Sequence, residues 1–188
     1  RPDTLLITRQ LRLSELRWGL IGLCLLQLAA CSSAWNATKK TAQVLWDPSI
    51  PVGEAKDLPT QLTYSMYALD KVNPNAAGDA TPLELVVYEL EDDSKFLAAD
   101  FDSLKADYKE ALGSNYIDHS DYTLLPGQFK FIDHFAVDED TRYIGIMAHF
   151  SDPEVAQWKK VVKIKPMGRE YHLLMFFSEQ DIVLDKVE

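Results

Sequence analysis

The feature that most constrains the fold of this chain is a period-two alternation of apolar side chains in several short segments. Leu62, Tyr64, Met66 and Ala68 alternate with other residues, and residues 144–150 repeat the pattern. Successive side chains of a strand point to opposite faces, so this alternation predicts half-buried β-strands. Further segments of this kind bring the total to seven or eight short strands. The expected fold is mainly β, a two-sheet antiparallel β-sandwich.

One stretch of helical spacing interrupts the predicted strands. Its apolar side chains follow one another at intervals of three or four residues: Leu97, Phe101, Leu104, Tyr108 and Leu112. This stripe predicts a small helical insertion near 94–113, with one helix over about 95–112 that could break at 98–100. Gly113 is the predicted C-terminal cap, because glycine readily adopts the conformation that ends a helix.

A long connection separates the first predicted strand from the second, in which Leu83, Leu85 and Val87 alternate. The connection comprises Asp70, Lys71, Val72, Asn73, Pro74, Asn75, Ala76, Ala77, Gly78, Asp79, Ala80, Thr81 and Pro82. Hairpin connections usually have about two to five residues, and much longer loops are often functional. From the residues alone, a recognition loop and a merely exposed connection both stay open.

The N-terminal segment has the layout of a bacterial lipoprotein signal. Four arginines precede an apolar run at 20–28, which leads into Leu28-Ala29-Ala30-Cys31. A basic region, a short apolar region and small residues before a cleavage point are typical of a secretory signal peptide. A cysteine directly after the small residues resembles a lipobox, which is cut before the cysteine. We therefore expect residues 1–30 to be removed and Cys31 to be acylated.

Two other interpretations of the N-terminal segment stay open. A transmembrane anchor needs about 20 apolar residues, whereas the run from Trp18 to Ala30 has 13 and includes Gln27. A buried core helix is the second alternative. If the signal is cleaved, residues 31–60 comprise the lipidated cysteine, a polar tether and an N-terminal extension. Residues 61–188 then form the β-sandwich domain with its helical insertion.

Charge and cysteine content narrow the range of partners. The chain has 19 basic and 29 acidic residues, of which residues 1–30 hold four and two. The remainder carries a net charge of −12, which argues against nucleic acid as a partner and against electrostatic docking on anionic lipid. Cys24 and Cys31 are the two cysteines. Cleavage and acylation would therefore leave no thiol for a disulfide or a zinc site.

Several short segments follow the lipobox in a characteristic order. They are Leu69-Asp70, Asn73-Pro74, Gly78, the run 82–90, Phe96, Asp100-Phe101, Leu104, Leu112-Gly113, Leu125-Pro126-Gly127-Gln128, the run 143–150 and Trp158-Lys159. This order resembles the outer-membrane lipoproteins of bacterial type VI secretion systems, the TssJ family. Two positions depart from the pattern, because Ser151 and Lys159 stand where members of the family often have arginine.

The resemblance implies a transthyretin-like β-sandwich with an added helical element. It also implies that acyl chains on Cys31 anchor the protein in outer-membrane lipid, facing the periplasm, and that Ser32 directs sorting to this membrane. The loop Asp70–Pro82 would bind the periplasmic C-terminal domain of the inner-membrane protein TssM. TssL would associate indirectly through the membrane complex, in which multiple copies would form a ring-like assembly.

The sequence offers no strong catalytic candidate. Neighbouring carboxylates such as Asp92-Asp93 lie in predicted turns or near helix starts, where acids favour capping and solvation. The histidines are at least 15 residues apart, at His119, His134, His149 and His172. We therefore expect no enzyme, no metal site and no cofactor other than the covalent acyl chains on Cys31.

A periplasmic ligand-binding lipoprotein with a β-sandwich fold is the alternative function. Tyr64, Tyr67, Tyr88 and Trp158 could line its pocket, although aromatic side chains at alternating spacing more often pack in a core. A cavity of roughly a few hundred Å³ with converging polar groups would favour this alternative. An envelope hydrolase, the third hypothesis, would need a nucleophile and a base together in a cleft.

Overall fold

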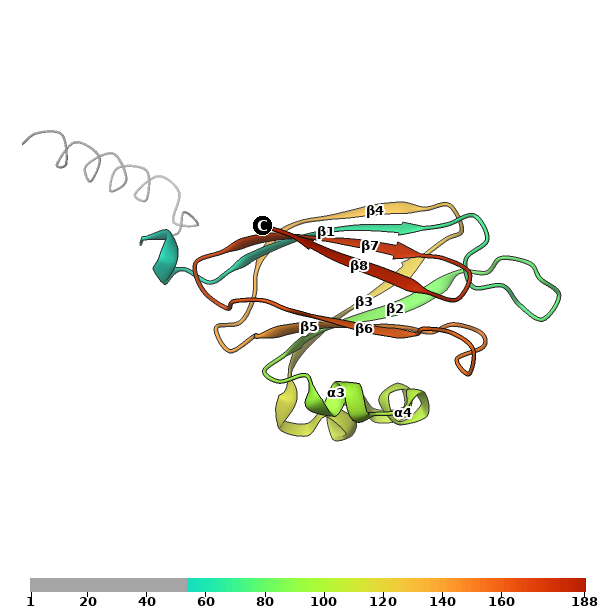
Figure 1. The fold of residues 1–188 in the computed structure, drawn as a ribbon, viewed down its shortest axis with the longest axis horizontal. Helices are drawn as coiled ribbons and strands as arrows, with labels where there is room; N and C mark the ends of the chain where they lie inside the picture. The colour runs from blue at the N-terminus through green and yellow to red at the C-terminus, as the bar shows by residue number, and fades with distance from the viewer. Residues whose placement is uncertain (1–53) are drawn as a thin grey trace, which may run out of the picture. The chain divides into compact units, whose positions relative to one another are not determined.

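The computed structural model describes residues 54–188. This part of the chain forms two four-stranded sheets that lie face to face (Figure 1). The strands are β1 (Gln61–Ala68), β2 (Leu83–Leu90), β3 (Tyr116–Leu124), β4 (Phe129–Ala136), β5 (Tyr143–Ala148), β6 (Lys159–Lys163), β7 (Glu170–Phe177) and β8 (Ile182–Val187). Sheet A has the order β4-β1-β7-β8, and sheet B has the order β3-β2-β5-β6. The predicted β-sandwich is confirmed.

The pairing within sheet A adds a feature that the sequence did not predict. Strands β1 and β7 run parallel, whereas the other hydrogen-bonded neighbours in both sheets run antiparallel. After β1 the chain crosses into sheet B, and it enters β7 from β6 of that sheet. No hairpin therefore links β1 to β7, and the two strands are free to run in the same direction.

The main core lies between the two sheets. The alternating side chains of β1, namely Leu62, Tyr64, Met66 and Ala68, are at most 2% exposed, as the alternation predicted. They pack in one cluster with the inward side chains of β2, β5 and β7. Complete burial of a leucine or methionine side chain stabilises a fold by about 1.5–3 kcal/mol, so this layer holds the sandwich together.

A second core lies on the outer face of sheet B, beneath helices α3 (Ser94–Ala98) and α4 (Phe101–Leu112) (Figure 1). Phe96 and Leu104 from the helices are at most 1% exposed. They pack in one cluster with Tyr88, which is on the opposite face of β2 from the main core. Strand β2 is therefore buried on both faces, and the helical insertion is part of the folded domain.

The helical insertion breaks where the sequence predicted. Ala99 has extended backbone, with ψ of 142°, and ends α3. Asp100 then caps α4, because its carboxylate accepts a hydrogen bond from the Ser103 N–H at 2.8 Å. Gly113 caps the C-terminus of α4 with φ of 50°, as expected from its position after the apolar stripe.

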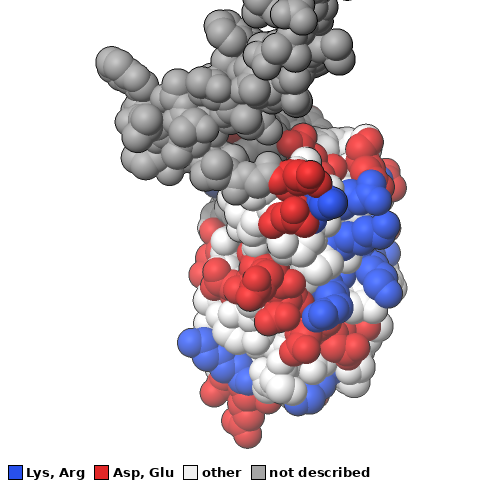
Figure 2. All heavy atoms as spheres, turned by 90° about the vertical axis from the view of Figure 1, so that its left-hand side faces the viewer, with Lys and Arg blue, Asp and Glu red and all other residues white. Residues whose placement is uncertain are grey.

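Two short 3-10 turns complete the described elements, η1 (Ala55–Asp57) before β1 and η2 (Gly113–Asn115) before β3. Figure 2 shows the end of the domain at the start of β1, where acidic side chains spread over the surface and basic side chains line one side. Within residues 54–188, no helix has the length and the apolar character needed to cross a membrane.

Candidate partner-binding loop

The loop between β1 and β2 projects beyond the ends of the strands (Figure 1). Strand β1 ends at Ala68 and β2 begins at Leu83. The predicted loop, Asp70–Pro82, therefore lies entirely within this connection. The sandwich holds both ends of the loop, so its position is set by a rigid scaffold.

The base of the loop is held by the side chain of Asn73, which is 5% exposed. Its Nδ2 group donates to Thr81 Oγ1 at 2.9 Å and to the Pro82 carbonyl at 3.0 Å. Its Oδ1 atom accepts from the Ser151 backbone N–H at 2.6 Å and from the Ser151 hydroxyl at 2.9 Å. An amide side chain has two donor and two acceptor positions, and at Asn73 all four are used.

The backbone around Asn73 explains why this residue type stands there. Its φ is 50°, a left-handed conformation that asparagine tolerates better than most residues. The adjacent Val72 is fully buried and belongs to the main core. The Thr81 hydroxyl donates to the Asn73 carbonyl at 2.6 Å. The two ends of the loop are thus tied to each other and to the core.

The tip of the loop is a compact turn that closes on itself. Asn75 Oδ1 accepts hydrogen bonds from the Ala77 N–H at 2.9 Å and from the Asp79 N–H at 3.0 Å. A backbone bridge joins Pro74 to Ala80 below the turn. Because its own hydrogen bonds shape the tip, a partner would meet a preformed structure.

The structure divides the 13 predicted loop residues into a base and a tip. Val72 and Asn73 are buried, whereas residues 75–79 are exposed, as are Asp70, Lys71 and Pro82. Pro74, Ala80 and Thr81 are half-buried. The exposed residues are available to a partner, whereas Val72 and Asn73 hold the loop in place. The predicted lipidation residue Cys31 and the predicted sorting residue Ser32 lie outside the described residues.

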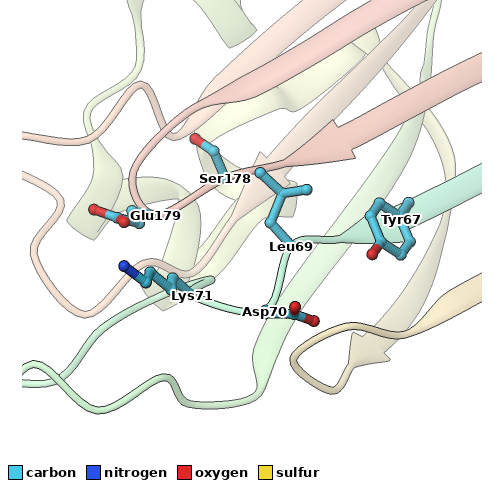
Figure 3. A pocket seen from close by; sticks show the side chains of 6 residues that line it. All are labelled: Tyr67, Leu69, Asp70, Lys71, Ser178 and Glu179. Atoms are coloured by element: carbon cyan, nitrogen blue, oxygen red, sulfur yellow. The ribbon is translucent and has the colours of Figure 1, made fainter.

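A shallow hollow of about 490 Å³ lies beside the start of the loop (Figure 3). In Figure 3, Lys71 and Glu179 lie on one side of the hollow and Tyr67 lies on the other. The lining residues come from the start of the loop, from the end of β1 and from the turn between β7 and β8: Tyr67, Leu69, Asp70, Lys71, Ser178 and Glu179. The hollow is open to solvent, which suits a contact surface better than an enclosed ligand site.

The four aromatic residues of the ligand-binding alternative do not share a pocket. Tyr64 is buried between the sheets, whereas Tyr88 is buried beneath the helices. Trp158 packs against the ring of Phe101, with ring centroids 5.2 Å apart. Of the four, Tyr67 alone lines the hollow. The arrangement therefore gives the ligand-binding alternative no converging site among the described residues.

The histidines and carboxylates are similarly dispersed. No group of three or more His, Cys, Asp or Glu side chains within residues 54–188 is placed to hold a metal ion. His149 lies against sheet B, with its ring 5.9 Å from that of Phe101, and its ring nitrogens have no hydrogen-bond partner. Burial and the nearby Lys105 lower the pKa of His149, and Glu84 partly offsets this effect. The environment favours a neutral, packed histidine.

Lys159, one of the two departures from the family pattern, has a structural role. Its ammonium group donates to three carbonyls at the end of α3: Phe96 at 3.1 Å, Leu97 at 2.6 Å and Ala99 at 2.7 Å. Carbonyls at the end of a helix lack intrahelical partners and favour a cation. Lys159 therefore fixes the helical insertion to sheet B. Ser151, the other departure, bonds to Asn73, a contact that no local sequence pattern indicated.

The fold and the loop define a β-sandwich module that presents a preformed, exposed loop on a rigid scaffold. A family model described as "Type VI secretion lipoprotein, VasD, EvfM, TssJ, VC_A0113" matches residues 60–180. The chain belongs to this family of type VI secretion lipoproteins. The family is one of membrane-bound components of a secretion apparatus and not one of known enzymes.

Solved structures agree with this assignment. The T6SS lipoprotein TssJ1 from Pseudomonas aeruginosa is 32% identical, with a TM-score of 0.65, over 69% of this chain and 98% of that one. Serratia marcescens Lip, a membrane-bound component of the type VI secretion system, has the same fold, with 23% identity, a TM-score of 0.60 and coverage of 68% and 97%. A structure described as a type VI membrane complex gives 23% identity, a TM-score of 0.60 and coverage of 69% and 99%. No curated protein sequence matches the chain.

Proposed function

We propose that this protein is an outer-membrane-anchored lipoprotein of the type VI secretion membrane complex and that it docks the periplasmic C-terminal domain of the inner-membrane protein TssM. The observation that carries this proposal is the loop between β1 and β2, with its buried base at Asn73 and its exposed tip at 75–79. A structure described as the TssM C-terminal domain from EAEC also matches this fold, at 22% identity.

The geometry of the loop explains how it would bind. Association costs free energy when flexible segments must be ordered, and a preformed loop lowers that cost. The turn at Asn75 already fixes the tip through two hydrogen bonds. Ala76 and Ala77 are exposed and small, so a partner can approach the backbone of the tip closely. In this proposal Asn73 positions the loop without touching the partner.

The anchor forms the other end of the proposed link. Acyl chains on Cys31 would hold the protein in the outer membrane, with Ser32 directing it there, and residues 32–53 would give the domain reach. Stable membrane attachment needs more than one acyl chain or a second signal, which the modification of a lipoprotein cysteine supplies. TssL would join indirectly through TssM, and several copies would assemble in a ring. The role is structural, with no catalytic step.

Shortening the loop tests this function. Deletion of residues 76–78 removes the exposed tip but leaves the base at Asn73 intact. We expect the full chain with this deletion to fold but to lose co-purification with the TssM C-terminal domain. Replacement of Glu139 and Asp140 by alanine, in the exposed turn between β4 and β5, is the control and leaves binding unchanged. Retained co-purification after the deletion would refute the docking role.

A further inference from the structure

The outer faces of the two sheets are covered unequally. Helices α3 and α4 lie over the outer face of sheet B (Figure 1). No described element lies over the outer face of sheet A, which is formed by β4, β1, β7 and β8 in this order. A sheet face that carries large apolar side chains and no cover within its own domain is a candidate contact surface.

Large apolar side chains cross this face in one line at the end nearest the loop. Tyr67 of β1 is paired in register with Phe129 of β4 and with Phe176 of β7, and Phe176 is paired with Val183 of β8. We call Phe129, Tyr67, Phe176 and Val183 the outer row. Phe129 is 59% exposed, Phe176 is 44% exposed and Val183 is 49% exposed. The rings of Tyr67 and Phe176 meet edge to face, 6.4 Å apart.

The register explains why the outer row faces away from the core. On β1, β7 and β8, a residue next to each member of the row is buried between the sheets: Ala68, Phe177 and Ile182 are all 0% exposed. Because successive side chains of a strand alternate between faces, their neighbours must point outwards. The side chains of the outer row are therefore apolar surface that is exposed to solvent and that does not contribute to the core.

The outer face becomes more polar with distance from the loop. The next row holds Phe131 and Leu174 together with Ser65 and Asp185. In the row after that, His172 hydrogen-bonds to Thr63 at 2.6 Å and to Ser65 at 3.0 Å, beside Val187. The aromatic side chains are thus concentrated towards the loop end of sheet A.

The hollow connects the outer row to the loop. Tyr67 belongs to the row and lines the hollow together with Leu69, Asp70 and Lys71 at the start of the loop. The turn between β3 and β4 lies beside the same segment, since a Cβ atom on Gly127 would be 2.6 Å from Asp70 Oδ1. The start of the loop, the hollow and the outer row therefore border one another at one end of the domain.

We propose that the outer row is a second part of the surface that docks the periplasmic C-terminal domain of TssM, continuous with the loop across the hollow. This inference rests on the proposed function, which names the partner. Protein interfaces have an apolar centre that is rich in aromatic side chains and a polar rim. Here the row forms the centre, and Asp70, Lys71 and Glu179 form the rim.

The position of the row favours a protein partner over lipid. The described chain enters β1 at Gln61, and the row lies near the other end of this strand. Eight residues of strand span about 25 Å. If Cys31 anchors the chain at its N-terminal side, the row lies at the opposite end of β1 from the point where the chain enters the domain. The rim beside the row holds two acidic groups, Asp70 and Glu179, against one basic group, Lys71, which also disfavours contact with anionic lipid.

Two valines of β8 provide a matched test. Val183 lies in the outer row and is 49% exposed, whereas Val187 lies on the same face at the far end and is 51% exposed. We expect Val183→Glu, in the full chain purified in detergent, to weaken binding of the TssM C-terminal domain about tenfold, and Phe129→Thr/Phe176→Thr to weaken it further. Val187→Glu leaves the affinity within about twofold of that of the unmodified chain.

The outcomes separate this inference from the proposed function. If deletion of 76–78 abolishes binding while the row variants bind normally, the row is not part of the interface but the docking role stands. If the unmodified chain does not bind the domain, both proposals fail. If the row variants bind the TssM domain with unchanged affinity, three other results would each assign the row to a different occupant. Release of the variants from membranes would point to lipid, and loss of a dimer would point to a second copy of the chain. A lowered midpoint of unfolding would point to a segment of the chain itself.

Discussion

Asn73 Oδ1 accepts two hydrogen bonds from Ser151, one from its backbone N–H at 2.6 Å and one from its hydroxyl at 2.9 Å. The two residues are 78 positions apart in the sequence. This contact ties the base of the β1–β2 loop to the connection between β5 and β6. It makes the base of the loop part of the scaffold, while the tip at 75–79 stays exposed.

Replacement of Asn73 should weaken both stability and partner binding. Asn73→Ala leaves the Ser151 and Thr81 groups without their partner and puts alanine at a φ of 50°. We expect a loss of about 2–3 kcal/mol in the free energy of unfolding, measured by urea denaturation. Asn75→Ala, which removes exposed hydrogen bonds of the tip, is the control and costs less than about 1 kcal/mol. Equal losses in the two variants would contradict the role of Asn73.

Removal of the Lys159 ammonium should loosen the helical insertion. Lys159→Met leaves three carbonyls at the end of α3 without their donor. We therefore expect a loss of about 1–3 kcal/mol in the free energy of unfolding. Hydrogen exchange of the α3 amides should rise in the same variant. Lys160→Met is the matched control, because its partly exposed ion pair with Asp181 contributes under about 1 kcal/mol. Unchanged exchange in α3 would show that Lys159 does not hold it.

His149 should make the domain less stable in mild acid. Burial and Lys105 lower its pKa in the folded state below the ordinary value of 6.5. The unfolded chain therefore binds the proton more readily, and the contribution of His149 to stability is lost as the pH falls below about 6.5. We expect His149→Gln to reduce the loss of unfolding free energy between pH 7 and pH 5. Identical pH profiles for the two proteins would contradict a neutral, half-buried His149 in the folded state.

Two glycines with left-handed backbone should differ in their tolerance of alanine. Gly168 has φ of 74°, and a Cβ atom there would lie 2.7 Å from the Lys56 Cα atom. Gly78 has φ of 87°, with open space around the position of a Cβ atom. The backbone strain alone costs about 1–2 kcal/mol, so Gly78→Ala should lower the free energy of unfolding by about that amount. Gly168→Ala should lower the stability more, as measured by thermal unfolding. Equal losses in the two variants would mean that the segment around Lys56 moves to make room for the Cβ atom.

Acylation should depend on Cys31. We expect Cys31→Ser to abolish incorporation of a fatty-acid analogue, to release the protein from the membrane fraction and to stop secretion by the apparatus. Cys24→Ser is the control, because this residue lies in the segment that we predict to be removed, and it should retain the label on the mature protein. Labelling of the Cys31→Ser protein would exclude the proposed anchor.

Local sequence patterns determined the elements that depend on neighbouring residues. The alternation at Leu62, Tyr64, Met66 and Ala68 predicted β1, because burial on one face needs only a period of two. The apolar stripe ending at Leu112 predicted the helical insertion and its break before Phe101. The boundaries of the loop followed from the same two strand patterns. The order of segments was also sufficient to indicate the family.

Tertiary structure alone decided the features that join distant parts of the chain. The parallel pairing of β1 with β7 aligns Tyr67 with Phe176, and β4 adds Phe129 to the same line. Alternation within one strand assigns each side chain to a face and so limits the register to steps of two residues, but it does not identify the neighbouring strand or choose among those registers. The bond between Asn73 and Ser151 likewise forms only when two loops meet in the folded domain. The sequence thus determined which segments are strands, helix and loop, whereas long-range pairing decided which surface they build together.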